Sequence, residues 1–196
     1  MSSNPAESTE ASADSSAPLV PPSATALPKA IILGFSKGGT VVNQIIAELA
    51  HWKPVSAGTM MNGGKPFPQL FHETRDHTCP VSKDELPSSI AEIHYLDVGL
   101  NSAGAYLTDS TVIGKAVENL LANHIRARFT LHGTPKQWCD KNRSWIRKER
   151  DRLLQLLNEE ANRCEGKLQV TERFYFANMP SSLQMHFEII ENIDIS

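Results

Sequence analysis

Short apolar segments alternate with amphipathic segments along most of the chain. The apolar segments, which carry large side chains on both faces as strands of a helix-covered parallel sheet do, are residues 30–34, 91–97, 127–132 and 168–177. The amphipathic segments, in which apolar residues recur every three or four positions as in helices with one buried face, are residues 38–52, 109–124 and 143–164. This alternation predicts an α/β fold of right-handed βαβ units, with a mostly parallel sheet flanked by helices.

Two other segments lack such a pattern. Residues 1–27 are almost entirely Ser, Ala, Pro, Thr and Glu, with too few large apolar groups to offset the entropy of ordering. We therefore expect a disordered Ser/Pro/Ala-rich tail over residues 1–27 and one domain over residues 28–196. Residues 53–88 contain several Gly and Pro without a clear period, and we interpret them as a long excursion with one short helix near residues 67–72.

Charge and cysteine content narrow the functional classes. The 196-residue chain has a formal net charge of −3 and no block of Lys or Arg, so it lacks the basic face typical of nucleic-acid-binding domains. Cys79, Cys139 and Cys164 are widely separated and match neither zinc-ligand spacing nor a disulfide framework. We therefore expect reduced thiols in a reducing compartment, no nucleic-acid partner, and neither a metal ion nor a cofactor.

Membrane and targeting signals are the next consideration. No apolar run approaches the ~18–20 residues that span a bilayer. The N-terminal segment has neither the apolar core of a signal peptide nor the Arg-rich, acid-poor character of a transit peptide. The chain therefore predicts no membrane span and, if expressed as written, a cytoplasmic location.

The segment Gly-Phe-Ser-Lys-Gly, residues 34–38, joins the first predicted strand to the first predicted helix. A Gly-x-Ser-x-Gly turn in this setting is typical of the nucleophile elbow of α/β-hydrolases, in which the serine hydroxyl stands exposed above the sheet. We interpret Ser36 as a nucleophile and Gly34 and Gly38 as glycines that the tight turn requires. The backbone N–H of Lys37, at the start of the helix, is the expected first oxyanion donor.

A serine nucleophile needs a general base and an acid that orients it, and in this fold they follow the serine in the order acid, then histidine. Asp140 follows the strand at residues 127–132 and is the predicted acid, although it could equally cap the helix that begins near Arg143. Asp97 ends the preceding strand and is the alternative acid. His186 lies beyond the last predicted strand, in the loop where the base belongs, and is the predicted base.

The other histidines are given no catalytic role. His132 lies upstream of Asp140 at the end of its strand, which fits a structural role or a wall of the substrate pocket better than a general base. The remaining histidines show no metal-ligand spacing; they are His51, His72, His77, His94 and His124.

The chain also resembles a known family through four segments. These are "ILGFSKGGTVVNQIIAEL", "IHYLDVGLNSAGAYLTD", "LHGTPKQWCDKNRSWIRKE" and "MPSSLQMHFEII". They are similar to the mitochondrial chromosome two open reading frame sixty-nine family, which is poorly characterised and of α/β-hydrolase type. The resemblance covers almost everything from Pro28 onward. It implies a mitochondrial setting and a hydrolase-like fold, and its motifs fall on Ser36, Asp140 and His186, but it supplies no substrate.

Compared with that fold, the first strands of the sheet and the loop that supplies the second oxyanion donor are missing before Ala30. We therefore expect a fragment, an alternative product or an incomplete gene model, with a partial α/β-hydrolase-like fold, an open edge at the elbow strand and impaired catalysis. Two functions stay open. One is a serine hydrolase acting on an ester, thioester or amide, with a small acyl-type substrate. The other is a non-catalytic hydrolase-like module that binds a protein partner or metabolite in mitochondria.

Overall fold

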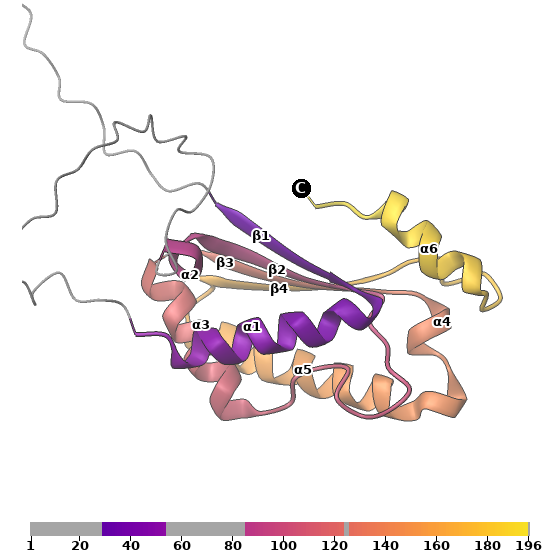
Figure 1. Ribbon diagram of the computed structural model, residues 1–196, viewed down its shortest axis with the longest axis horizontal. Helices are drawn as coiled ribbons and strands as arrows, with labels where there is room; N and C mark the ends of the chain where they lie inside the picture. Colours follow the sequence, from indigo (N-terminus) through magenta and orange to yellow (C-terminus); the bar gives the residue numbers. More distant parts are fainter. Residues whose placement is uncertain (1–28, 54–84, 124–125, 196) are drawn as a thin grey trace, which may run out of the picture.

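The computed structural model describes residues 29–53, 85–123 and 126–195, and these form a four-stranded sheet with helices packed against it (Figure 1). In chain order the elements are β1 (Ala30–Phe35), η1 (Ser36–Gly38), α1 (Gly39–His51), α2 (Glu85–Ser89), β2 (Ile90–Leu96), α3 (Ser110–Asn123), β3 (Ala127–Gly133), α4 (Pro135–Trp138), η2 (Lys141–Arg143), α5 (Ser144–Arg163), β4 (Leu168–Phe174) and α6 (Leu183–Asn192).

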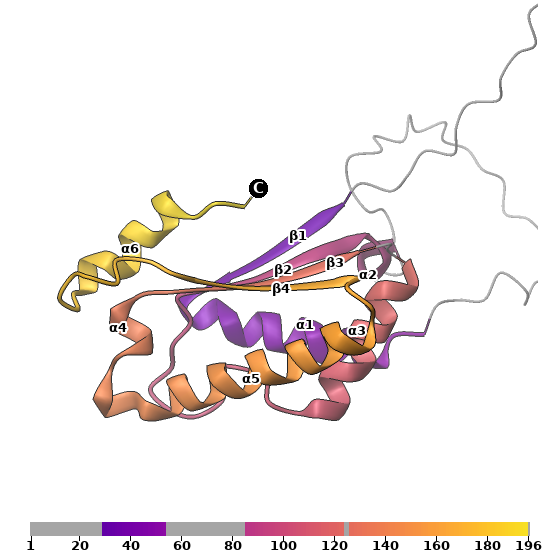
Figure 2. The same cartoon turned by 180° about the vertical axis from the view of Figure 1, so that it is seen from behind.

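The sheet has the order β1-β2-β3-β4, and each neighbouring pair is parallel. Helices α1, α3 and α5 all lie on one face of the sheet, as both views show (Figures 1 and 2). Crossovers of one hand between strands laid down in sequence order place every connecting helix on the same side. The predicted α/β fold with a parallel sheet is therefore confirmed.

The register of the strands explains why one face is apolar. Ile32 pairs with Ile93, Ile93 with Phe129, and Phe129 with Val170, so one row of apolar side chains runs across all four strands. Tyr95 and its neighbours extend this surface, which the helices cover with buried residues such as Val42, Ile113 and Leu157. The amphipathic spacing of the helices therefore meets the apolar row of the sheet, and this contact forms the core.

The opposite face of the sheet is more polar. The row that begins at Leu33 continues through His94, Thr130 and Thr171. In the described part of the chain β1 is an edge strand, and its side chains Ile31 and Leu33 remain 48% and 38% exposed. Helix α6 does not cover this face directly but lies past the carboxyl ends of the strands (Figures 1 and 2).

The strands and long helices begin and end within a few residues of the predicted positions. Four short elements were not predicted: the four-residue helix α4, the five-residue helix α2, and the 3₁₀ helices η1 and η2. A further difference concerns the C-terminal segment, which was expected as a loop around His186 but forms α6. The Ser182 hydroxyl accepts from the backbone N–H of Met185 and caps this helix, so the segment after the Pro-Ser turn becomes helical.

Several expectations fall outside the described residues. They are the tail at residues 1–27, most of the excursion at residues 53–88 with its short helix near residues 67–72, and Cys79. Cys139 and Cys164 are both free thiols. Within the described ranges, no helix is both long enough and apolar enough to cross a membrane.

Candidate functional site

Ser36 lies at a strained turn between β1 and η1. Its φ is +55°, in the left-handed region that a residue with a Cβ seldom adopts. Such strain costs on the order of 1–3 kcal/mol and persists only where the surrounding structure enforces it, which makes it a pointer to a functional position. The chain enters the turn from an edge strand and leaves it directly into a helix, as the Gly-x-Ser-x-Gly pattern predicted.

Of the two glycines assigned to the turn, only Gly34 is required for steric reasons. A Cβ at Gly34 would lie 2.4 Å from Cγ2 of Val42 and 2.7 Å from the carbonyl oxygen of Gly38. A Cβ at Gly38 would meet nothing within 4 Å, so the steric role expected for Gly38 is wrong. The second close approach is at Gly39, where a Cβ would lie 2.4 Å from Val98.

Three side chains from three separate elements meet beside this turn. The Oγ of Ser36 lies 3.1 Å from Nε2 of His186, which is in the first turn of α6. The other ring nitrogen of His186, Nδ1, lies 2.6 Å from Oδ2 of Asp97, the residue that follows β2. Asp97 is fully buried and His186 is 7% exposed. The ring of Phe35 stacks on the imidazole at a centroid distance of 4.6 Å and limits its rotation.

The carboxylate in contact with His186 is therefore Asp97, the alternative in the sequence interpretation, and not Asp140. Asp140 accepts from Nε of Arg143 at 2.8 Å and from the backbone N–H of Asn142, so it caps η2 at the entrance to α5. The hydrogen bond from Arg143 is the main reason why the pKa of Asp140 is lowered. Strand order explains why Asp97 and not Asp140 is in contact with His186. Asp97 follows β2, which is next to β1 in the sheet, whereas Asp140 lies beyond β3 and α4.

Asp97 is held by a residue that the sequence interpretation missed. The backbone N–H of Thr134 donates to Oδ1 of Asp97 at 2.7 Å, and the Thr134 hydroxyl donates to Oδ2 at 3.0 Å. The same hydroxyl accepts from the backbone N–H of Lys136 and caps α4. The Thr-Pro pair at residues 134–135 is a recognisable helix start, so the cap could have been found from the sequence. Its contact with Asp97 could not.

A second group of histidines lies on the polar face of the sheet. Nδ1 of His94 is 3.0 Å from Nε2 of His132, and Nδ1 of His132 is 3.0 Å from the hydroxyl of Tyr175. Both imidazoles are buried, and burial is the main cause that lowers the pKa of His94 and lowers that of His132 to about 4. His132 is therefore neutral at physiological pH, and its hydrogen-bond partners are His94 and Tyr175. His94 was given no role.

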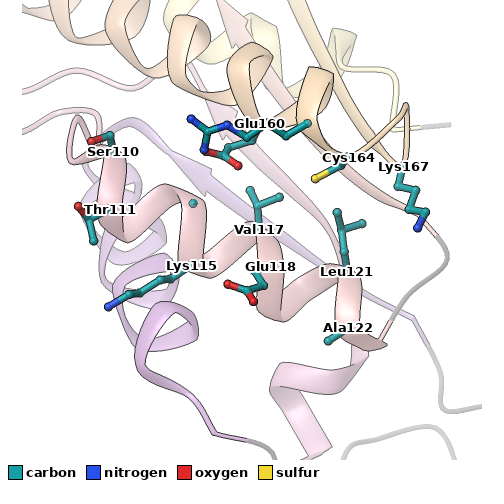
Figure 3. Close-up of a pocket in the computed structure, with 12 residues that line it drawn as sticks. Ser110, Thr111, Lys115, Val117, Glu118, Leu121, Ala122, Glu160, Cys164 and Lys167 are labelled. Carbon is teal, nitrogen blue, oxygen red and sulfur yellow. The ribbon is translucent and has the colours of Figure 1, made fainter.

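A cavity of about 680 Å³ lies between α3 and α5 (Figure 3), and Ser36 is not among the residues that line it. Its lining includes apolar side chains from α3, such as Val117 and Leu121, and charged ones from both helices, such as Lys115 and Glu160. In the part of the chain that the structure describes, no three His, Cys, Asp or Glu side chains are arranged to hold a metal ion.

The fold and this group of side chains define an α/β protein in which a serine, a histidine and an aspartate touch at the carboxyl ends of a parallel sheet. The sequence model of the C2orf69 family matches residues 2–162. The chain therefore belongs to the C2orf69 family, and the resemblance seen in the sequence is confirmed. The match includes Ser36, Asp97 and Asp140, and it ends before His186.

Individual relatives are similar over most of this chain. A protein described as mitochondrial protein C2orf69 homolog from Danio rerio is 26% identical over 182 residues, which are 89% of this chain and 42% of the relative. The corresponding proteins of Mus musculus and Homo sapiens are each 28% identical over 162 residues, or 82% of this chain, and 34% and 32% of those proteins. The chain thus spans less than half the length of these relatives. No solved structure matches it.

Proposed function

We propose that this protein is a serine hydrolase that acts on an ester, thioester or amide, with Ser36 as nucleophile, His186 as general base and Asp97 as the acid that orients the base. The observation that carries the proposal is the unbroken contact from Ser36 Oγ to His186 Nε2 and from His186 Nδ1 to Asp97. Each residue comes from a different element and follows the order Ser, Asp, His along the chain, as in α/β-hydrolases.

The geometry supports a two-step acyl transfer. His186 Nε2 takes the hydroxyl proton of Ser36 as Oγ attacks the carbonyl carbon, and the charge on the imidazolium is balanced by Asp97. The backbone N–H of Lys37, at the start of the helical segment, donates to the oxyanion of the tetrahedral intermediate. His186 then returns the proton to the leaving group, and a water molecule activated by the same base hydrolyses the acyl-enzyme.

The experiment is covalent labelling with an alkyl fluorophosphonate, which reacts with an activated serine and releases fluoride. Intact-mass and peptide mass spectrometry follow the label and its position. We expect modification at Ser36, its loss in Ser36→Ala, and a rate at least about 10²-fold lower in His186→Ala, because general bases contribute ~10²–10⁴ to rate. The ratio of the labelling rates of the variants to that of the wild-type chain is the diagnostic quantity.

Two exposed residues provide matched controls. Ser102→Ala and His51→Ala remove an exposed serine and an exposed histidine that do not take part in the contact between Ser36, His186 and Asp97, so both should label at the wild-type rate. Circular dichroism melts establish that each variant is folded. Labelling at another serine, or an unchanged rate in folded His186→Ala, contradicts the proposed catalytic role.

A second candidate is a module that binds a metabolite or a protein partner without catalysis. The cavity of about 680 Å³ between α3 and α5 favours it, because that cavity is built without any of the three residues at the serine turn (Figure 3). This reading predicts no labelling at Ser36 in folded protein. It also predicts that a partner recovered with the wild-type chain no longer binds to Gly114→Trp, in which the new side chain fills the cavity from α3.

The names of the matched relatives support a mitochondrial setting for this protein. Protease protection of the endogenous protein in purified mitochondria tests this directly. Digestion of the protein before the outer membrane is opened contradicts it.

A further inference from the structure

The short helix α4 carries Gln137, whose side chain lies beside Nδ1 of the His186 imidazole. Thr134 caps α4 and also donates to Asp97, so this one turn of helix is tied to the carboxylate. Two residues after the first turn begins, Gln137 extends its amide to within 3.4 Å of Nδ1 of His186, measured from Nε2 of the amide. Gln137 is 6% exposed, so its amide depends on protein partners.

The hydrogen-bonding groups around Nδ1 do not match in this orientation of the amide. In the proposed function, Nδ1 carries the proton that it donates to Asp97 at 2.6 Å. The amide nitrogen of Gln137 is also a donor, so two donors face each other. At the same time the carbonyl oxygen Oε1 of Gln137 is buried and has no hydrogen-bond partner among the described residues. A half-turn of the amide exchanges the two atoms, removes the donor–donor contact and gives the carbonyl a donor.

Space beside the amide is reserved by a glycine. A Cβ at Gly99 would lie 2.1 Å from Oε1 and 2.6 Å from Cδ of Gln137. Any side chain at Gly99 would therefore push the amide against His186 or away from it. The chain leaves the turn after Asp97 through this residue, so the carboxylate and the space for the amide are supplied by one loop.

We propose that Gln137 is a positioning residue for His186, with its side-chain carbonyl turned towards Nδ1 so that it shares the Nδ1 proton with Asp97. A second acceptor at Nδ1 favours the tautomer in which Nε2 is free to accept from Ser36. It also restrains the ring at Nδ1, while Phe35 stacks on the ring itself. The proposal rests on the proposed function for its consequence in rate, but the tautomer of His186 is a property of the folded chain alone.

The direction in which Gln137→Met changes the labelling rate at Ser36 distinguishes three possibilities. Gln137→Met keeps the length of the side chain and removes both polar atoms. If the carbonyl faces the imidazole, we expect about a three- to tenfold lower labelling rate at Ser36 and a smaller fraction of Nδ1-protonated His186. If the amide nitrogen faces it, Gln137→Met removes support for the opposite tautomer and the rate rises. If Gln137 only packs, neither quantity changes. The second and third results each overturn the proposal.

Long-range ¹H–¹⁵N spectra of the full 196-residue chain measure the tautomer of each histidine ring. The signals of His186 are identified by their absence from the spectrum of His186→Gln. Gln155→Met is the control, because Gln155 is exposed on α5 and its amide donates a hydrogen bond to Glu159, another exposed position of that helix. Gly99→Ala is a second variant, acting by displacing the amide, and is expected to lower the Nδ1-protonated fraction as well. A folded protein that is not labelled at Ser36 contradicts the proposed function, whereas an unchanged tautomer in Gln137→Met and Gly99→Ala contradicts this inference.

Discussion

Acidification should destabilise the fold through the buried pair His94 and His132. His132 is fully buried, its Nε2 lies 3.0 Å from His94, and its pKa is lowered from 6.5 to about 4, first by burial and then by His94 and Arg173. The unfolded chain therefore binds a proton at His132 at a pH where the folded chain does not. The contribution of His132 to stability is complete when the pH is above the pKa of His132 in the unfolded chain. It is lost as the pH falls towards the pKa of His132 in the folded chain.

The size of the stability loss follows from the two pKa values of His132, 6.5 in the unfolded chain and about 4 in the folded chain. This difference corresponds to about 3 kcal/mol of unfolding free energy when the pH lies well below both values. Between pH 7 and pH 4.5 the expected loss from His132 alone is about 2 kcal/mol. His94 adds to the loss in the same direction, because burial also lowers its pKa. Asp140 adds little in this window, since its pKa is lowered from 3.8 and its contribution is lost only at still lower pH.

Urea unfolding at half-unit steps from pH 7.5 to pH 4.5, followed by circular dichroism, measures the effect. His132→Gln retains hydrogen-bonding capacity but does not titrate, so its free energy of unfolding should fall by about 2 kcal/mol less than that of the wild type across this range. His51→Gln, at an exposed position on α1, should keep the wild-type slope. A wild-type slope in folded His132→Gln would refute the reasoning.

Two further comparisons test the site. Asp97→Asn should lower the rate of Ser36 labelling by up to ~10⁴, because the neutral amide no longer holds the required tautomer of the imidazole. Asp140→Asn should be labelled at the wild-type rate. A larger loss of rate in Asp140→Asn than in Asp97→Asn would return the orienting role to Asp140. Gly34→Ala should cost about 1–3 kcal/mol of unfolding free energy, because its Cβ overlaps Val42 and the backbone of Gly38, while Gly38→Ala should be close to neutral. Equal urea midpoints for these two variants would contradict the steric account.

The three residues of the candidate site also show how far a sequence motif reaches. Ser36 is identified by neighbours within two positions, because the turn that exposes it is a local arrangement of strand, glycine and helix. His186, the proposed base, is 150 positions away from Ser36, and His186 and Asp97 are separated by 89 positions. Chain order and residue type narrowed these partners to a few candidates. Strand order then determined which of them meet.

The sequence by itself determined the four strands and the three long helices. Apolar runs and three-to-four-residue spacing place β1 to β4 and the three long helices within a few residues of their observed ends, because these patterns reflect which face of each element is buried. Asp109 comes directly before α3, and its carboxylate accepts from the backbone N–H groups of Thr111 and Val112. Caps and buried faces depend on residues close in sequence, so they can be predicted from it.

Only the tertiary structure decided which distant groups share a site. In the folded chain Asp97 is in contact with His186, which lies on α6, whereas Asp140 pairs with Arg143. The side chain of Gln137 also reaches the imidazole of His186. The tertiary structure also buries His94 against His132, two residues whose sequence neighbours give no sign of the contact. These pairings follow from the order and register of parallel strands, which are set by the packing of the whole sheet and not by any local pattern.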